Sequence, residues 1–112
     1  MTPPDDIVTR AIDFRLLDGE ELHRSYPDTF DIPPHNLRHV LVPGDLVKLL
    51  FEIVDPPDDA PGAERMWVKV AQVIGERYVG TLANQPVAIT SVALDSPIEF
   101  EPHHVIDIDP GG

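Results

Sequence analysis

Histidines are the first residues of this chain whose types and spacing could do chemistry. His35 and His39 stand four residues apart in "HNLRH", so a helix would place both rings on one face, where they could share a metal ion. His103 and His104 are adjacent in "EPHHV", and only one of them could join such a site if the chain is extended. A metal-assisted hydrolase is therefore one hypothesis. Its motif is incomplete, because Asn36 occupies the place of the glutamate in H-E-x-x-H. We predict no bound metal and no cofactor.

Trp67 is the only tryptophan, and it lies in "RMWVKV" with Lys69 two residues further on the same face of an expected strand. An aromatic side chain on the wall of a small sheet can anchor a partner. It can equally cover the edge of the core while its indole nitrogen bonds a carbonyl oxygen. Both interpretations stay open at this point, and we place Trp67 and Lys69 among the candidate partner-binding residues.

Carboxylates form several pairs, of which Asp58 with Asp59 and Glu99 with Glu101 are further candidates for partner contact. Paired carboxylates cleave glycosides or bind divalent metals only when they converge in a cleft, whereas these lie in a loop or on one strand face. The chain has no nucleophile elbow, phosphate-binding loop or dinucleotide fingerprint. We therefore predict a non-enzymatic protein with no catalytic residues.

The elements that must position these side chains are mostly short strands. "DLVKLLFEIV" predicts a strand over 45–54, and alternation places one apolar set on a single face: Val47, Leu49, Phe51 and Ile53. "RMWVKVAQV" and "RYVGTLAN" predict an antiparallel hairpin in which Gly80 marks a bulge, a bend or a close packing approach. Alternation in the first of these strands places four residues on one face: Met66, Val68, Val70 and Gln72. "QPVAI", "SPIEFEP" and "VIDI" predict shorter strands, and "PHNLRHVL" predicts a helix of two turns at most.

Length and proline content bound the fold. The chain has 112 residues and 13 prolines, which fall mostly between the apolar segments and favour short strands over long helices. We expect an irregular amino-terminal arm over 1–20 and one β-rich domain over 21–112. The predicted class is mainly β (α+β), as a small SH3-like barrel or a strongly bent antiparallel sheet with one or two short helices.

Charge limits the partners. With 20 acidic and 8 basic residues, the net charge is -12, and the cations are scattered along the sequence. Direct binding to nucleic acid or to a membrane is therefore disfavoured, and a basic protein is the expected partner. The chain has no cysteine, no apolar segment long enough to span a bilayer and no visible secretory signal in "MTPPDDIVTR". We expect a cytoplasmic location.

The strings "ERMWVKVAQVIGERYVGTLANQPVAI" and "SPIEFEPHHVIDI" resemble the YegJ-like family of bacterial domains, the domain of unknown function numbered 2314. They are also similar to a neighbouring group of immunity proteins from polymorphic toxin systems. This resemblance spans roughly residues 22–108 and implies a compact β-rich domain with no established reaction. Together with the charge, it suggests an acidic protein-binding domain, in one version an immunity protein or inhibitor of a basic toxin. A structural module that associates with itself through an open sheet edge is the remaining hypothesis.

Overall fold

The computed structural model describes residues 14–54, 62–87, 89 and 92–110. Within them the chain is mostly β, with two short helices, and this confirms the predicted fold class. The elements in chain order are β1 (Phe14–Leu16), α2 (Gly19–Ser25), α3 (His35–Arg38), β2 (Leu46–Ile53), β3 (Ala63–Ile74), β4 (Arg77–Leu82), β5 (Pro97–Phe100), the 3-10 helix η1 (Pro102–His104) and β6 (Val105–Ile108).

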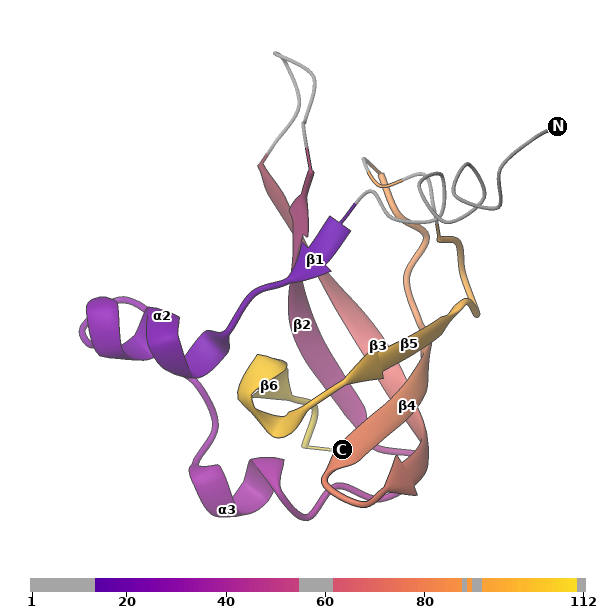
Figure 1. Ribbon diagram of the computed structural model, residues 1–112, viewed down its shortest axis with the longest axis horizontal. Helices are drawn as coiled ribbons and strands as arrows, with labels where there is room; N and C mark the ends of the chain where they lie inside the picture. The colour runs from indigo at the N-terminus through magenta and orange to yellow at the C-terminus, as the bar shows by residue number, and fades with distance from the viewer. Residues whose placement is uncertain (1–13, 55–61, 88, 90–91, 111–112) are drawn as a thin grey trace, which may run out of the picture.

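The strands form one antiparallel sheet that curls into a half-barrel, as the bent-sheet form of the prediction requires. Its order is β1-β2-β3-β4-β5, and β6 also pairs with β2. β1 lies opposite Phe51–Ile53, while β6 lies opposite Val47–Leu49, so both strands use the same edge of β2. Figure 1 shows α2 and α3 on one side of the strands, with β4 and β5 on the other.

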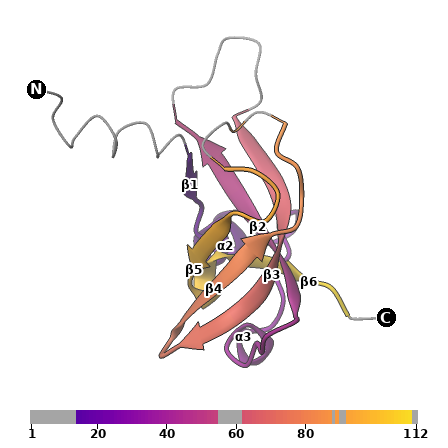
Figure 2. The same cartoon turned by 90° about the vertical axis from the view of Figure 1, so that its right-hand side faces the viewer.

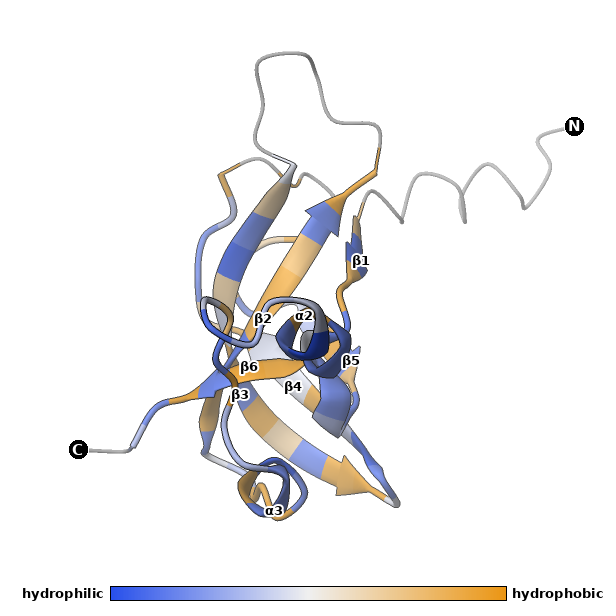
Figure 3. Ribbon diagram, turned by 90° about the vertical axis from the view of Figure 1, so that its left-hand side faces the viewer, coloured by the Kyte–Doolittle hydropathy of each residue, from blue (hydrophilic) through white to orange (hydrophobic). Residues whose placement is uncertain are grey.

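The concave face of the sheet holds the core. The predicted alternation in β2 is confirmed, because Val47, Leu49 and Phe51 are fully buried and Ile53 is nearly so. Met66, Val68 and Val70 of β3 complete this face as predicted. Figure 3 shows hydrophilic and hydrophobic residues alternating along the strands, beside a mostly hydrophilic α2. Burial of these branched and aromatic side chains is the main favourable term in folding.

The predicted β3–β4 hairpin is also confirmed, and Figure 2 shows its tip at the lower end of the molecule. Gly75 forms the turn with a φ of 61°, a conformation that favours glycine. The pairing shifts between Val70 and Gln72, so Ala71 is an extra residue in β3 opposite Gly80. A Cβ at Gly80 would lie 2.4 Å from the Lys69 carbonyl oxygen. The bulge therefore turns Gln72 out to solvent, and Gly80 allows the two strands to approach closely.

Two segments differ from the predictions. Regular structure begins at Phe14, inside the stretch expected as an irregular arm; residues 1–13 lie outside the described residues. The described residues of "QPVAI" form no strand. Ile89 instead packs into the core from an irregular segment, and Pro86 has no N–H to donate to a strand pairing.

The helix α2 starts where Asp18 accepts a hydrogen bond of 3.1 Å from the Glu21 backbone N–H.

Candidate functional site

The outer, convex face of β2 and β3 carries the tryptophan. Trp67 is half-buried, and Lys48 lies directly opposite it, with Nζ 4.6 Å from the centre of the indole ring. Both backbone groups of Trp67 bond the segment after β4, since its N–H donates to Asn84 Oδ1 at 2.5 Å and its carbonyl accepts from Ala83 N at 2.8 Å. Among the described residues, the indole N–H of Trp67 has no hydrogen-bond acceptor. The hypothesis that the indole nitrogen bonds a carbonyl oxygen therefore gains no support within the described residues.

A groove of about 570 Å³ lies beside this face. Its apolar lining comes from the segment after α2, from α3 and from β6, and includes Phe30, Ile32, Leu37, Ile106 and Ile108. Four charged residues also line it: Asp31, Lys48, Arg65 and Asp107. The segment after α2 is held in place where the His23 imidazole donates a hydrogen bond of 2.7 Å to the Phe30 carbonyl oxygen. The groove therefore combines apolar and charged side chains in its lining.

Three cations gather on this face, although the sequence had suggested only scattered cations. Lys48 on β2 and Arg65 and Lys69 on β3 all project from the outer face, because the register pairs Lys48 with Trp67 between the other two. The Arg65 guanidinium lies 5.8 Å from the centre of the Phe30 ring. The ion pairs within the described part of the chain are formed by other cations, namely Arg15, Arg38 and Arg77. The outer face around Trp67 therefore carries three cations, and Asp107 of β6 lies opposite one of them, Lys48.

The carboxylates predicted for partner contact are not brought to Trp67. Glu99 lies on β5, two strands from β3, and pairs with Arg77 at 2.5 Å. Glu101 caps η1. Asp58 and Asp59 fall outside the described residues. The candidate set that sequence reasoning proposed therefore divides, and only Trp67 and Lys69 lie on one surface.

The histidines do come together, but not as a metal site. His35, His39 and His103 line a smaller pocket of about 250 Å³ together with three glutamates. The His35 and His39 rings stack with centres 3.8 Å apart, and the His39 Nδ1–H donates to the His35 carbonyl oxygen at 2.8 Å. Within the described ranges, no group of three histidine, aspartate or glutamate side chains could hold a metal ion. The hydrolase hypothesis gains no support from this arrangement.

His104 has a structural role next to that pocket. Its Nδ1 accepts a hydrogen bond of 3.0 Å from the Glu101 backbone N–H, and this completes the capping box at η1. Burial, followed by the nearby His103, lowers the pKa of His104 from its ordinary 6.5 to about 4. The ring is therefore neutral at pH 7 and can act as an acceptor.

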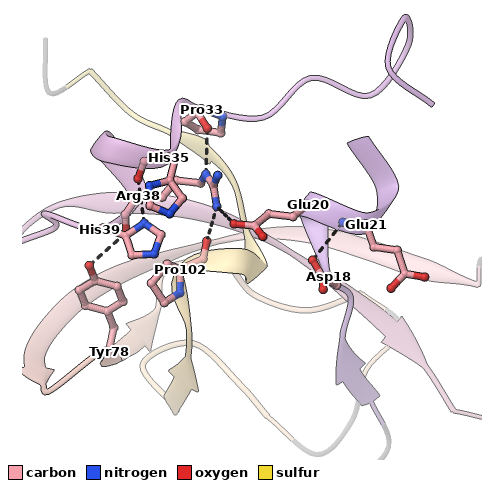
Figure 4. Close-up of polar contacts among 9 residues, drawn as sticks. All are labelled: Asp18, Glu20, Glu21, Pro33, His35, Arg38, His39, Tyr78 and Pro102. Carbon is pink, nitrogen blue, oxygen red and sulfur yellow. Dashed lines mark hydrogen bonds and ion pairs between the residues drawn. The ribbon is translucent and has the colours of Figure 1, made fainter. Parts of the chain in front are cut away.

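Arg38 is the charged residue that the described chain buries, with 4% of its surface exposed. Figure 4 shows its guanidinium pointing at three acceptors. It donates to the Pro33 carbonyl at 2.8 Å, to Glu20 Oε2 at 2.6 Å and to the Pro102 carbonyl at 3.2 Å. The hydrogen bond from Arg38 is the main cause that holds the pKa of Glu20 below its ordinary value. Arg38 thus ties α3 to α2 and η1, which fixes the end of the groove that α3 provides.

These features define a small β-rich domain with a curled antiparallel sheet and an open groove on its outer face. Residues 36–108 match the model of a family described as "Uncharacterized protein conserved in bacteria (DUF2314)", and the chain belongs to this family. The match runs from within α3 to the end of β6, and it includes Trp67 and half of the residues that line the groove. No curated protein and no solved structure matches the chain. Among the described residues, none of the helices has the length and apolar character needed to cross a membrane.

Proposed function

We propose that this chain is a non-enzymatic protein-binding domain that holds a segment of a partner protein in the groove beside Trp67. The observation that carries the proposal is the combination of an open apolar groove with a half-buried tryptophan at its side, whose N–H has no acceptor among the described residues. Partner-binding surfaces concentrate their energy in such aromatic anchors, surrounded by charged groups at the rim.

The partner in this proposal is basic overall. A net charge of -12 attracts a positively charged protein over long distances and raises the association rate. It also opposes nucleic acids and anionic lipids. A cytoplasmic immunity protein or inhibitor that blocks a basic toxin is one specific form of this role. Its association rate should fall as salt is added, because exposed charges are screened beyond about 8 Å at physiological ionic strength.

A pull-down from a bacterial lysate tests the proposal, with the domain as bait and bound proteins identified by mass spectrometry. We expect one basic protein at near-stoichiometric yield, and a loss of about tenfold or more in its capture by the Trp67→Ala bait. Tyr26→Ala is the matched control, because Tyr26 is an exposed aromatic residue outside the groove lining. A thermal melt establishes that each variant is folded. Equal capture by the wild-type and Trp67→Ala baits would contradict the role of this surface.

A further inference from the structure

Two of the cations at the groove lie side by side and make no ion pair among the described residues. Lys48 pairs in register with Trp67, and Arg65 pairs with Leu50, so Lys48 and Arg65 are diagonal neighbours on the same face of adjacent strands. Two like charges at such positions repel each other. Asp107 of β6 pairs in register with Lys48, but neither Asp107 nor Asp31 makes an ion pair with Lys48 or Arg65 in the described structure.

Both cations are held in place by aromatic rings. The Lys48 ammonium lies over Trp67 and the Arg65 guanidinium lies near Phe30, so neither long side chain is left to move freely in solvent. Groups that are already positioned lose less conformational entropy when a ligand binds. The two cations therefore form a preorganised pair of donors in the lining of the groove.

We propose that this pair receives the carboxylate of an acidic side chain in an extended segment of the partner, a proposal that rests on the proposed function above. One carboxylate can accept charge-assisted hydrogen bonds from an ammonium and a guanidinium at once, and it removes their repulsion. An apolar side chain next to that acid packs against the apolar lining of the groove, which includes Leu37, Ile106 and Ile108. The contact is local, and it is compatible with a partner that is basic overall.

The groove favours a single carboxylate over a phosphate or a polyanion. Asp31 and Asp107 also line it, and they would repel a ligand that carries more than one negative charge. The net charge of the chain adds to this repulsion. These acids can instead accept hydrogen bonds from the backbone of the bound segment.

The test uses blocked tripeptides whose only charge is the central side chain. Acetyl-Leu-Glu-Leu-amide is titrated into the full chain and compared with acetyl-Leu-Gln-Leu-amide, which has the same shape without the charge. Trp67 is the only tryptophan, so its indole N–H signal in a proton-nitrogen correlation spectrum reports on this site alone. We expect a saturable shift with the glutamate peptide and an affinity at least about tenfold weaker for the glutamine peptide.

Variants of the two cations complete the test. Lys48→Gln and Arg65→Gln should each weaken binding of the glutamate peptide about fivefold or more. Arg24→Gln should leave the affinity nearly unchanged, since Arg24 is an exposed cation on α2 that does not line the groove. Equal affinities for the two peptides, affinities that are unchanged in both groove variants, or no shift with a folded protein would each overturn the inference. The lysate experiment with Trp67→Ala decides the proposed function independently.

Discussion

Replacing Arg38 with alanine should destabilise the protein by about 3 kcal/mol, because three acceptors lose a charged donor at once. Hydrogen bonds to a charged group contribute about 1.5–3 kcal/mol each, and the carbonyl oxygens of Pro33 and Pro102 have no equally placed substitute. The cost of leaving Glu20 without its donor is smaller, because its side chain is 32% exposed and water can replace the arginine. The expected total loss of stability is therefore about 3 kcal/mol, which is near the lower end of the 3–5 kcal/mol typical of a broken buried ion pair.

Urea unfolding followed by far-ultraviolet circular dichroism measures this difference directly. For a domain of this size, about 3 kcal/mol corresponds to a fall in Tm of about 12–20 °C. Arg77→Ala is the matched control, because it removes an ion pair with Glu99 that is more than half exposed on both sides and should cost at most about 1 kcal/mol. A loss for Arg38→Ala no larger than that for Arg77→Ala would refute the reasoning. As a second measurement, the pKa of Glu20 in Arg38→Ala should rise from its lowered value.

Two further predictions concern the hairpin and the capping box. Gly80→Ala should destabilise the protein by about 2 kcal/mol or more, because the new methyl group would lie 2.4 Å from a backbone oxygen, whereas Gly62→Ala has open space and serves as control in a thermal melt. His104 has a lowered pKa of about 4, so the unfolded chain takes up a proton first and stability should fall as pH decreases from about 6.5 toward 4. His104→Gln keeps an acceptor for the Glu101 N–H and should make urea unfolding less dependent on pH over this range; an unchanged dependence would contradict the assignment.

The sheet could be predicted from the sequence because its core residues alternate without interruption. Val47, Leu49 and Phe51 reveal the buried face of β2, and Met66 and Val68 do the same for β3. The bulge at Ala71 could not be placed in this way. The apolar pattern of β3 does not reveal the extra residue, and only the glycine opposite hints at it. Alternation alone therefore places Gln72 on the buried face, which is wrong.

The candidate site depended on information that alternation does not contain. Trp67 and Lys69 were identified because one strand carries both, but Lys48 joins them only through the register between β2 and β3. The periodicity of each strand does not specify which residues of β2 and β3 lie opposite one another. The burial of Arg38 was missed for a different reason: arginine is usually exposed, and its three acceptors come from distant segments.

The shared edge of β2 also has a consequence for the order of folding. Leu17 N donates to the Leu50 carbonyl oxygen, and Val105 pairs with Leu49, so β1 and β6 meet end to end as one composite strand. β2 to β5 can assemble from neighbours in sequence, whereas this strand joins residues almost 90 positions apart through β2. Closing so long a loop is costly in entropy. We therefore expect β2–β5 to form early, and the two halves of the composite strand to dock last and to open first in hydrogen exchange.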